Sequence, residues 1–178
     1  MIITISGRPG SGKSAVAVRV AEALGMRHVS AGDFMRQMAA ERGMTILEFS
    51  RSAEDRESID REIDARTVQL SRESADFVMD ARLAWHFIPE SFKVFLEVSP
   101  EVAAQRIYEA QRGSEKENVS LENTKRAIES RTESERKRYL KYYGLDYAEH
   151  TQYDLVVDTS DLTIDQVVQR ILDRVPTS

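Results

Sequence analysis

The residues best suited to chemistry lie near the start of the chain, where glycines, a lysine and a serine follow a short apolar run. The stretch GRPGSGKS, residues 7–14, matches the phosphate-binding pattern Gly-x-x-x-x-Gly-Lys-Ser in full. In such a loop, backbone N–H groups turn inward at the positive end of a helix and form an anion-binding nest. Lys13 can reach the β and γ phosphates of a nucleoside triphosphate, and the Ser14 hydroxyl can bind Mg²⁺. We therefore expect ATP to bind at Gly7, Arg8, Pro9, Gly10, Ser11, Gly12, Lys13, Ser14 and Ala15.

A series of arginines follows this loop: Arg36, Arg82, Arg106, Arg112, Arg131, Arg136 and Arg138. Transfer of a phosphoryl group between two phosphates crowds negative charge into one site, and positioned guanidinium groups neutralise it. Arg131 and Arg138 are seven residues apart, close to two helical turns, so both can project into one cleft. The alternative is a solvated helix in which Glu129, Glu133 and Glu135 pair with these arginines.

Asp80 is a candidate for metal binding because it ends an apolar run, in VMDAR. A carboxylate at the carboxyl end of a parallel strand beside the phosphate loop is placed to hold a water bound to Mg²⁺. The alternative is that Asp80 only caps a following helix.

These residues need a framework of alternating strands and helices. Apolar runs predict strands at Ile2–Ile5, near Ser30, and at 77–80, 93–98 and 153–158. Apolar residues at every fourth position predict a helix from Gly12 to Gly25, and another helix begins at Pro100. The alternation indicates an α/β fold with a parallel sheet covered on both faces.

Two charged segments interrupt this alternation and are expected to lie over one end of the sheet. Residues 31–73 are helical in pattern, and residues 111–143 combine a polar loop with a long charged helix. We therefore expect one domain over 1–178, with a core of 1–30, 74–110 and 144–178, an acceptor-binding insertion at 31–73, and a lid with its helix at 111–143.

Composition excludes several classes of protein. The 178 residues include no cysteine and three scattered histidines, which argues against disulfides, thiolate metal sites and a histidine cluster. A net charge of −5 does not suit binding to nucleic acid. No stretch has the length of a membrane span, and the first residues do not match a secretory signal. We therefore expect a cytoplasmic protein without nucleic-acid or membrane partners.

The stretches GRPGSGKS, VSAGDFMRQMAAERGM, VMDAR and SRTESERKRYLKYYGLD, followed by YDLVVDTS, resemble the adenylate kinase-like nucleoside monophosphate kinases. The resemblance is closest to the archaeal-type cytidylate kinases and covers nearly the whole chain in order. SAGDFMR, AERGMTILEFS and RYLKYYGLD are more specific than the phosphate loop. The resemblance implies a three-layer P-loop kinase with a five-stranded parallel sheet, a helical insertion that binds the nucleoside monophosphate, and a short lid. It also implies transfer of the γ-phosphate of ATP to CMP, and to dCMP, with Mg²⁺.

Residue roles follow from this resemblance. It places Asp33, Arg36 and Arg82 at the acceptor and has Arg36 and Arg82 grip its phosphate. Arg131 and Arg138 would stabilise the migrating phosphoryl group.

The resemblance also places Arg106 near the ATP adenine, with the loop around Thr159. Lys13 would act in catalysis together with the lid arginines.

The chain departs from two related patterns after its third strand. Adenylate kinases carry Asp-Gly-Phe-Pro-Arg there, whereas this chain has Asp80-Ala81-Arg82, which argues against AMP as the preferred acceptor. The common bacterial cytidylate kinases carry Asp-Gly-Arg-Asp, and here Leu83 replaces the final acid. Recognition of the base must therefore come from other residues.

A second charged helix offers candidates for that recognition. Asp60 and Asp64 are four residues apart and could accept from the cytosine amino group, while Arg61 could donate to the cytosine carbonyl. The alternative is an exposed helix with Ile59 and Ile63 facing inward.

Two other functions remain open at this stage. One is a kinase of another small acceptor, such as AMP, UMP, shikimate or gluconate, on the same scaffold. The other is a nucleotide-dependent assembly factor or switch. We expect a monomer that binds ATP and CMP or dCMP.

Overall fold

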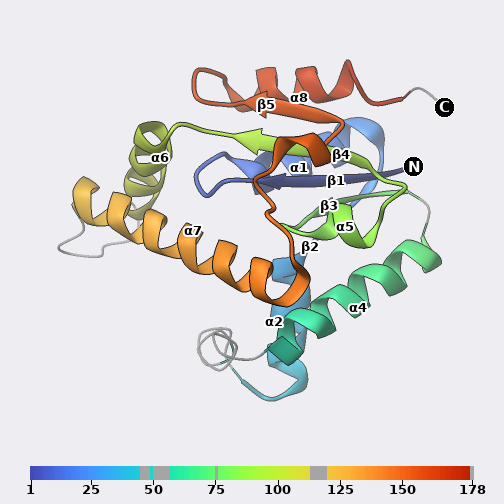
Figure 1. The fold of residues 1–178 in the computed structure, drawn as a ribbon. Helices are drawn as coiled ribbons and strands as arrows, with labels where there is room; N and C mark the ends of the chain where they lie inside the picture. Colours follow the sequence, from blue (N-terminus) through green and yellow to red (C-terminus); the bar gives the residue numbers. More distant parts are fainter. Residues whose placement is uncertain (45–48, 50–56, 75, 113–119, 177–178) are drawn as a thin grey trace.

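A parallel sheet forms the middle layer of the fold (Figure 1). The computed structural model describes residues 1–44, 49, 57–74, 76–112 and 120–176. The sheet consists of β1 (Ile2–Gly7), β2 (Arg27–Ser30), β3 (Phe77–Asp80), β4 (Phe92–Glu97) and β5 (Leu155–Asp158). The spatial order is β2-β3-β1-β4-β5, and all neighbouring strands are parallel. The predicted five-stranded parallel sheet is confirmed.

Helices cover both faces of the sheet. They are α1 (Lys13–Leu24), α2 (Ala31–Glu41), α4 (Glu57–Glu73), α5 (Ala84–Phe87), α6 (Pro100–Arg112), α7 (Leu121–Tyr143) and α8 (Ile164–Leu172), with a 3-10 turn at His150–Gln152. Helix α1 follows Gly12 and ends at Gly25, both with positive φ, as the sequence predicts. None of the described helices is long and apolar enough to cross a membrane.

The apolar core is divided between the two faces of the sheet, because side chains along each strand point alternately to one face and the other. Ile3, Ile5 and Val94 contribute to the cluster beneath α1 and α8. Phe95 belongs to a separate cluster formed with α5, α7 and the segment after α7. Because successive strand residues point to opposite faces, one short strand contributes to both apolar layers.

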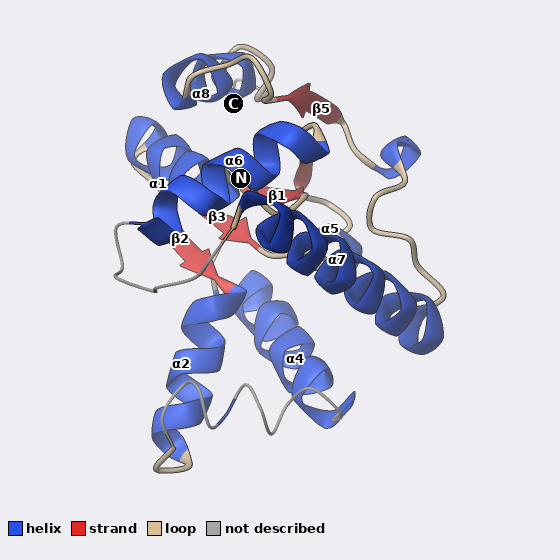
Figure 2. Cartoon of the chain, turned by 90° about the vertical axis from the view of Figure 1, so that its left-hand side faces the viewer, coloured by secondary structure: helices blue, strands red, loops and turns tan. Residues whose placement is uncertain are grey.

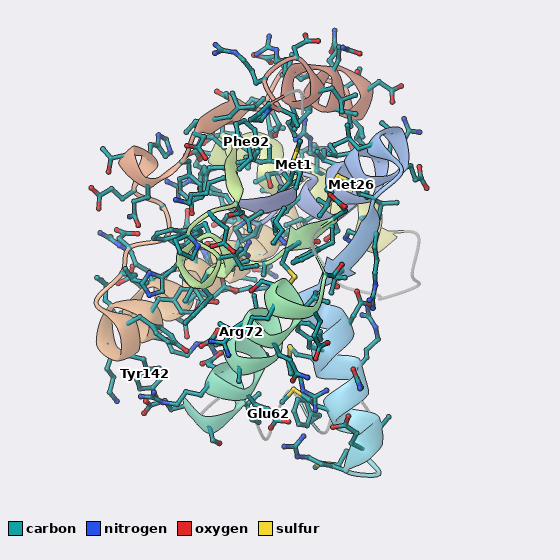
Figure 3. The ribbon with its side chains drawn as sticks, turned by 90° about the vertical axis from the view of Figure 1, so that its right-hand side faces the viewer. Met1, Met26, Glu62, Arg72, Phe92 and Tyr142 are labelled. Carbon is teal, nitrogen blue, oxygen red and sulfur yellow. The ribbon has the colours of Figure 1, made fainter. Side chains whose placement is uncertain are left out.

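Apolar residues also close the end of the sheet opposite the phosphate loop. Met1, Met26 and Phe92 pack against the cluster beneath α1 and α8, and Figure 3 shows them along that end of the strands. The first strand is therefore anchored at its start, which leaves its other end to carry the loop.

In the described part of the insertion after β2, helices α2 and α4 extend together from the sheet (Figure 2). Helix α2 begins with a capping box. The Ser30 side chain accepts from the Asp33 backbone N–H, and the Asp33 carboxylate accepts from the Ser30 backbone N–H. Met38, Ala39, Phe49 and Ile59 form a small apolar cluster within the insertion. Residues 45–48 and 50–56, and with them much of AERGMTILEFS, lie outside the described residues.

Helix α7 is the long charged helix expected next to a lid. It begins after Ser120, whose side chain accepts from Asn123 N, and ends at Gly144 in the left-handed conformation. The predicted lid loop falls largely on residues 113–119, which lie outside the described residues.

Candidate phosphoryl-transfer site

A cavity of about 1840 Å³ opens at the carboxyl end of β1 and β3. Its lining comes from the phosphate loop, the ends of β2 and β3, and helices α2, α4, α6 and α7. Ligands of open α/β sheets collect at this end of the strands. The cavity therefore joins both interrupting segments to the phosphate loop.

The loop itself is shaped by two glycines in the left-handed region. Gly10 and Gly12 have φ of 82° and 81°, which side chains with a Cβ rarely adopt. Gly10 lies so close to α6 that an added Cβ would be 2.7 Å from the Ala103 Cα atom. Gly7 and Ser11 support the loop from behind, where a Cβ on Gly7 would be 2.7 Å from the Leu96 carbonyl oxygen.

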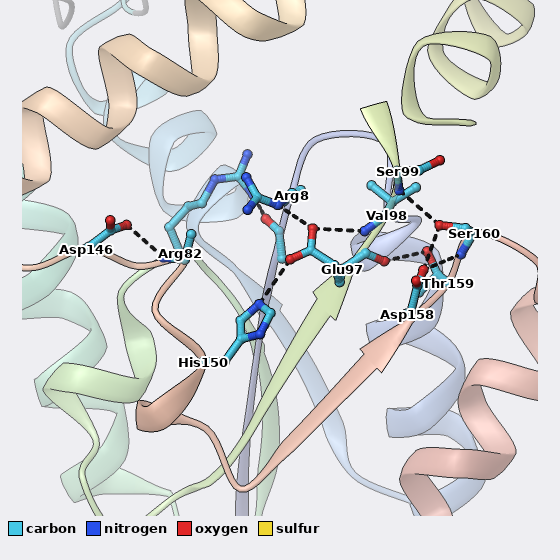
Figure 4. Close-up of polar contacts among 12 residues, drawn as sticks. Arg8, Arg82, Glu97, Val98, Ser99, Asp146, His150, Asp158, Thr159 and Ser160 are labelled. Atoms are coloured by element: carbon cyan, nitrogen blue, oxygen red, sulfur yellow. Dashed lines mark hydrogen bonds and ion pairs between the residues drawn. The ribbon is translucent and has the colours of Figure 1, made fainter. Parts of the chain in front are cut away.

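Glu97, at the end of β4, fixes one side of the loop (Figure 4). Its carboxylate is paired with Arg8, and its Oε2 lies 3.0 Å from Nε2 of His150. Its backbone carbonyl accepts from the Thr159 backbone N–H at 2.9 Å. Glu97 thus ties the phosphate loop to the segment after α7 and to the end of β5.

Arg106 and Thr159, which the resemblance places together, are in contact beside the loop. Nη1 of Arg106 donates to the Thr159 hydroxyl at 3.1 Å, and Nη2 donates to the Thr159 carbonyl at 2.7 Å. Nη1 also donates to the Gly10 carbonyl at 3.3 Å. Arg106 lines the cavity, with Thr159 supporting it from behind.

Lys13 forms an ion pair with Asp80 at the base of the cavity. The Asp80 side chain is only 2% exposed. Burial, and then the positive charge of Arg82, lower the pKa of Lys13 to about 7, whereas the ion pair with Asp80 favours the charged lysine. Polyphosphate at the loop would favour the charged lysine in the same way.

Oxygen donors suited to Mg²⁺ are present at the same place. Ser14 and Asp80 both line the cavity. Among the described residues no group of three or more His, Cys, Asp or Glu side chains could enclose a metal. Two protein oxygens fit the usual binding of Mg²⁺, in which water and substrate phosphates complete the shell.

The four predicted phosphate-binding arginines line this cavity together with Lys13: Arg36, Arg82, Arg131 and Arg138. Arg36 is exposed and paired with Asp33, which also lines the cavity. These arginines come from α2, from the residues after β3 and from α7, so the fold brings together groups that are distant in the sequence.

Carboxylates hold the other three arginines. Glu135 accepts from Nε of Arg82 at 2.8 Å and from Nε of Arg131 at 2.9 Å. Nε of Arg138 lies 3.3 Å from Oδ2 of Asp60. Of the alternative in which Glu129, Glu133 and Glu135 pair with the helix arginines, the structure has the Glu135–Arg131 pair, whereas Glu133 pairs with Lys137. The Glu135 pair does not keep Arg131 from lining the cavity.

Of the candidates for recognising the base, Asp60 and Asp64 line the cavity and Arg61 does not. Arg61 is exposed and paired with Glu57, one turn earlier on α4. The structure therefore does not bring Arg61 to the site that the sequence predicts for it.

Asp64 receives a hydrogen bond of 2.5 Å from the Tyr143 hydroxyl. Burial, opposed in part by this hydrogen bond, raises the pKa of Asp64 to about 6. Burial also raises the pKa of Asp60. The sequence gives no reason to single out Tyr143, because its partner on α4 is 79 residues away.

Solved structures with a similar fold include several small-molecule kinases. An uncharacterized protein from Eubacterium ventriosum has a TM-score of 0.75 at 15% identity, covering 97% of this chain and 96% of the other. Shikimate kinase from Aquifex aeolicus has a TM-score of 0.62 at 19% identity, covering 98% of this chain and 95% of the other. At this level of identity the similarity shows a shared P-loop kinase fold.

Sequence comparison is more specific. A cytidylate kinase from Methanocella arvoryzae is 42% identical over 160 residues, covering 90% of this chain and 88% of the relative. A cytidylate kinase from Archaeoglobus fulgidus is 39% identical over 176 residues, covering 98% and 94%. Residues 2–161 match the model of the cytidylate kinase-like family. With this match over most of its length, the chain belongs to the cytidylate kinase-like family.

Proposed function

We propose that this protein is an ATP-dependent cytidylate kinase that transfers the γ-phosphoryl group of ATP to CMP, and to dCMP, giving CDP or dCDP and ADP. One observation carries the proposal. Lys13 of the phosphate loop shares a cavity with Arg36, Arg82, Arg131 and Arg138 in a chain of the cytidylate kinase-like family. Such a cationic cavity suits two phosphate chains placed end to end.

Catalysis would consist mainly of positioning and charge stabilisation. The acceptor phosphate is already a nucleophile, so the site does not need a strong base. Arg36 and Arg82 would hold that phosphate. Lys13, Arg131 and Arg138 would stabilise the charge on the migrating group, after Lys13 exchanges Asp80 for phosphate oxygens.

Mg²⁺ would be held by the Ser14 hydroxyl and, through water, by Asp80. When bound, the ion neutralises charge on the phosphates of ATP. Release of Asp80 from Lys13 on ATP binding would leave its carboxylate available for that water.

The two bases would lie at opposite sides of the cavity. Arg106, beside the loop, would contact the adenine of ATP, whereas Thr159 is buried, does not line the cavity and would only hold Arg106 in place. Asp60 and Asp64 on α4 would accept from the amino group of cytosine, a donor that uracil lacks. A preference for CMP over UMP is the expected consequence.

Release of ADP with different acceptors separates this proposal from other kinases of the same fold. CMP and dCMP are expected to support ADP release well above UMP, AMP, shikimate and gluconate. A higher rate with any of the latter four compounds would identify that compound as the acceptor in place of CMP. Failure of all six, combined with binding of ATP, would favour a nucleotide-dependent assembly factor.

A bisubstrate mimic that joins ATP to CMP gives a second test. Because a ligand that binds only the folded state stabilises it by mass action, the mimic should raise the Tm more than ATP alone. An assembly factor with one nucleotide site would show no such additional increase.

Variants of α7 test the roles of its arginines. Arg131→Ala and Arg138→Ala, like Lys13→Ala, should each lower kcat by about 10²–10³-fold, the range for one lost charge-stabilising donor. Arg136→Ala is the matched control, because Arg136 lies on the same helix but is paired with Asp146 and does not line the cavity. If Arg131→Ala and Arg138→Ala turned over as fast as the unaltered protein, at unchanged Tm, these roles would be refuted.

A further inference from the structure

Glu135 has two partners that come from different parts of the chain. It lies on α7 with a side chain only 13% exposed. One carboxylate oxygen accepts from Arg82, which follows β3, and the other accepts from Arg131, one turn earlier on α7. The carboxylate thus lies between an arginine proposed to hold the acceptor and one proposed to stabilise the transferred group.

Both arginines use the same nitrogen for this contact. Arg82 and Arg131 each donate through Nε, so Glu135 does not occupy the terminal Nη1 and Nη2 groups. Nη1 of Arg82 donates to the Gly7 carbonyl, on the phosphate loop. For Arg131, the described part of the chain offers no partner other than Glu135. Its two terminal nitrogens therefore stay free to donate two parallel hydrogen bonds to the oxygens of a phosphate.

The two arginines differ in how firmly they are held by other groups. Arg82 is largely buried, and its carbonyl accepts from the Ser6 hydroxyl and the Trp85 indole N–H. The Tyr147 ring lies 5.5 Å from its guanidinium carbon. Arg131 is 68% exposed. Loss of Glu135 would therefore affect the position of Arg131 most.

Charge supports the same conclusion. Burial would raise the pKa of Glu135, but Arg82 and Arg131 hold that pKa below its usual value. Glu135 is therefore ionised at neutral pH and offsets the repulsion between two guanidinium groups that must lie close together.

From this geometry we infer that Glu135 is a positioning residue for phosphoryl transfer, which presents Arg131 to the transferred group and ties α7 to Arg82. The inference rests on the proposed function. It predicts that removal of Glu135 lowers kcat through Arg131, and leaves the KM for ATP within about threefold because the phosphate loop is unchanged.

The test is a double-mutant cycle of Glu135→Gln and Arg131→Ala, followed by steady-state ADP release and Tm. Glu135→Gln should lower kcat by at least tenfold, since a neutral amide offers only one accepting oxygen. In the Arg131→Ala background the same change should lower kcat by a clearly smaller factor, because the part of its effect that acts through Arg131 is lost and only the contact with Arg82 remains. Glu133→Gln, which only removes an exposed pair with Lys137, is the control.

Glu135→Gln leaves buried Arg82 without its counter-charge, so a second variant keeps the test independent of folding. Glu135→Asp retains the charge but is one methylene shorter, and it should lower kcat more in the presence of Arg131 than in its absence. Equal effects of either variant with and without Arg131, or turnover like the unaltered protein, would overturn the inference.

The unaltered protein is assayed with each acceptor first. If CMP is not the acceptor, the proposed function fails, and the cycle is measured with the acceptor that does support ADP release.

Discussion

Gly10 and Gly12 provide a prediction in which backbone strain and steric contact can be separated. Their φ values differ by only one degree, so replacement by alanine should cost similar backbone strain, about 1–2 kcal/mol. Their surroundings differ. A Cβ on Gly12 would meet nothing within 4 Å, whereas one on Gly10 would lie 2.7 Å from the Cα and 2.8 Å from the Cβ of Ala103.

The closeness to Ala103 sets the size of the expected difference. Two of the three contacts of the added Cβ are with backbone atoms of α6, which cannot turn away as a side chain could. Overpacking of this kind costs about 1–3 kcal/mol. Gly10→Ala should thus be about 2 kcal/mol less stable than Gly12→Ala, which for a chain of this size lowers the Tm by roughly 4–8 °C more.

Urea denaturation of the two variants and the unaltered protein, with Tm as a second measurement, checks this difference. Linear extrapolation gives each free energy of unfolding, and equal slopes would show that the variants unfold from comparable states. Equal losses for Gly10→Ala and Gly12→Ala would show that α6 does not press on the loop as described.

Three further predictions concern other parts of the molecule. Asp64→Asn should gain stability relative to the unaltered protein as pH rises from about 4 to above 6. The folded-state pKa of Asp64 is raised to about 6, so ionisation of this carboxyl opposes folding. Urea denaturation at several pH values checks this, and a stability difference between the two proteins that does not change with pH would contradict it. Thr163→Ala removes the side chain that caps α8 and should cost about 1 kcal/mol, a Tm decrease of roughly 2–4 °C, with unchanged kcat. Removal of Mg²⁺ with a chelator should abolish ADP release, and readdition should restore it; full activity without the ion would argue against the metal role of Ser14 and Asp80.

Most of the fold follows from local patterns. β1, the phosphate loop and α1 are predicted together because an apolar run, a glycine motif and apolar residues at helical spacing succeed one another. The fifth strand is shorter than its apolar pattern suggests and begins at Leu155. Tyr153 instead follows the 3-10 turn and donates from its hydroxyl to the Tyr147 carbonyl at 2.6 Å. Tertiary contact thus overrides strand propensity there.

The candidate site is predicted less completely. Spacing on a helix identifies Arg131 and Arg138 as neighbours on one face, and both line the cavity. It also makes Arg61 a neighbour of Asp60 and Asp64, but adjacent residues on a helix point in different directions and Arg61 turns to Glu57. The second role of Glu135 is invisible in the sequence, since Arg82 is 53 residues away and only the fold brings the two together.

The direct pairing of β2 with β3 has a consequence for how such proteins diversify. Residues 31–73 leave one strand and return to its immediate neighbour, with Ser30 opposite Asp80 in the register. The closure entropy of a connection grows only slowly with length, by about 0.6 kcal/mol per doubling. A segment attached in this way can be lengthened, shortened or exchanged for one that recognises another molecule, while the nucleotide-binding half keeps its architecture.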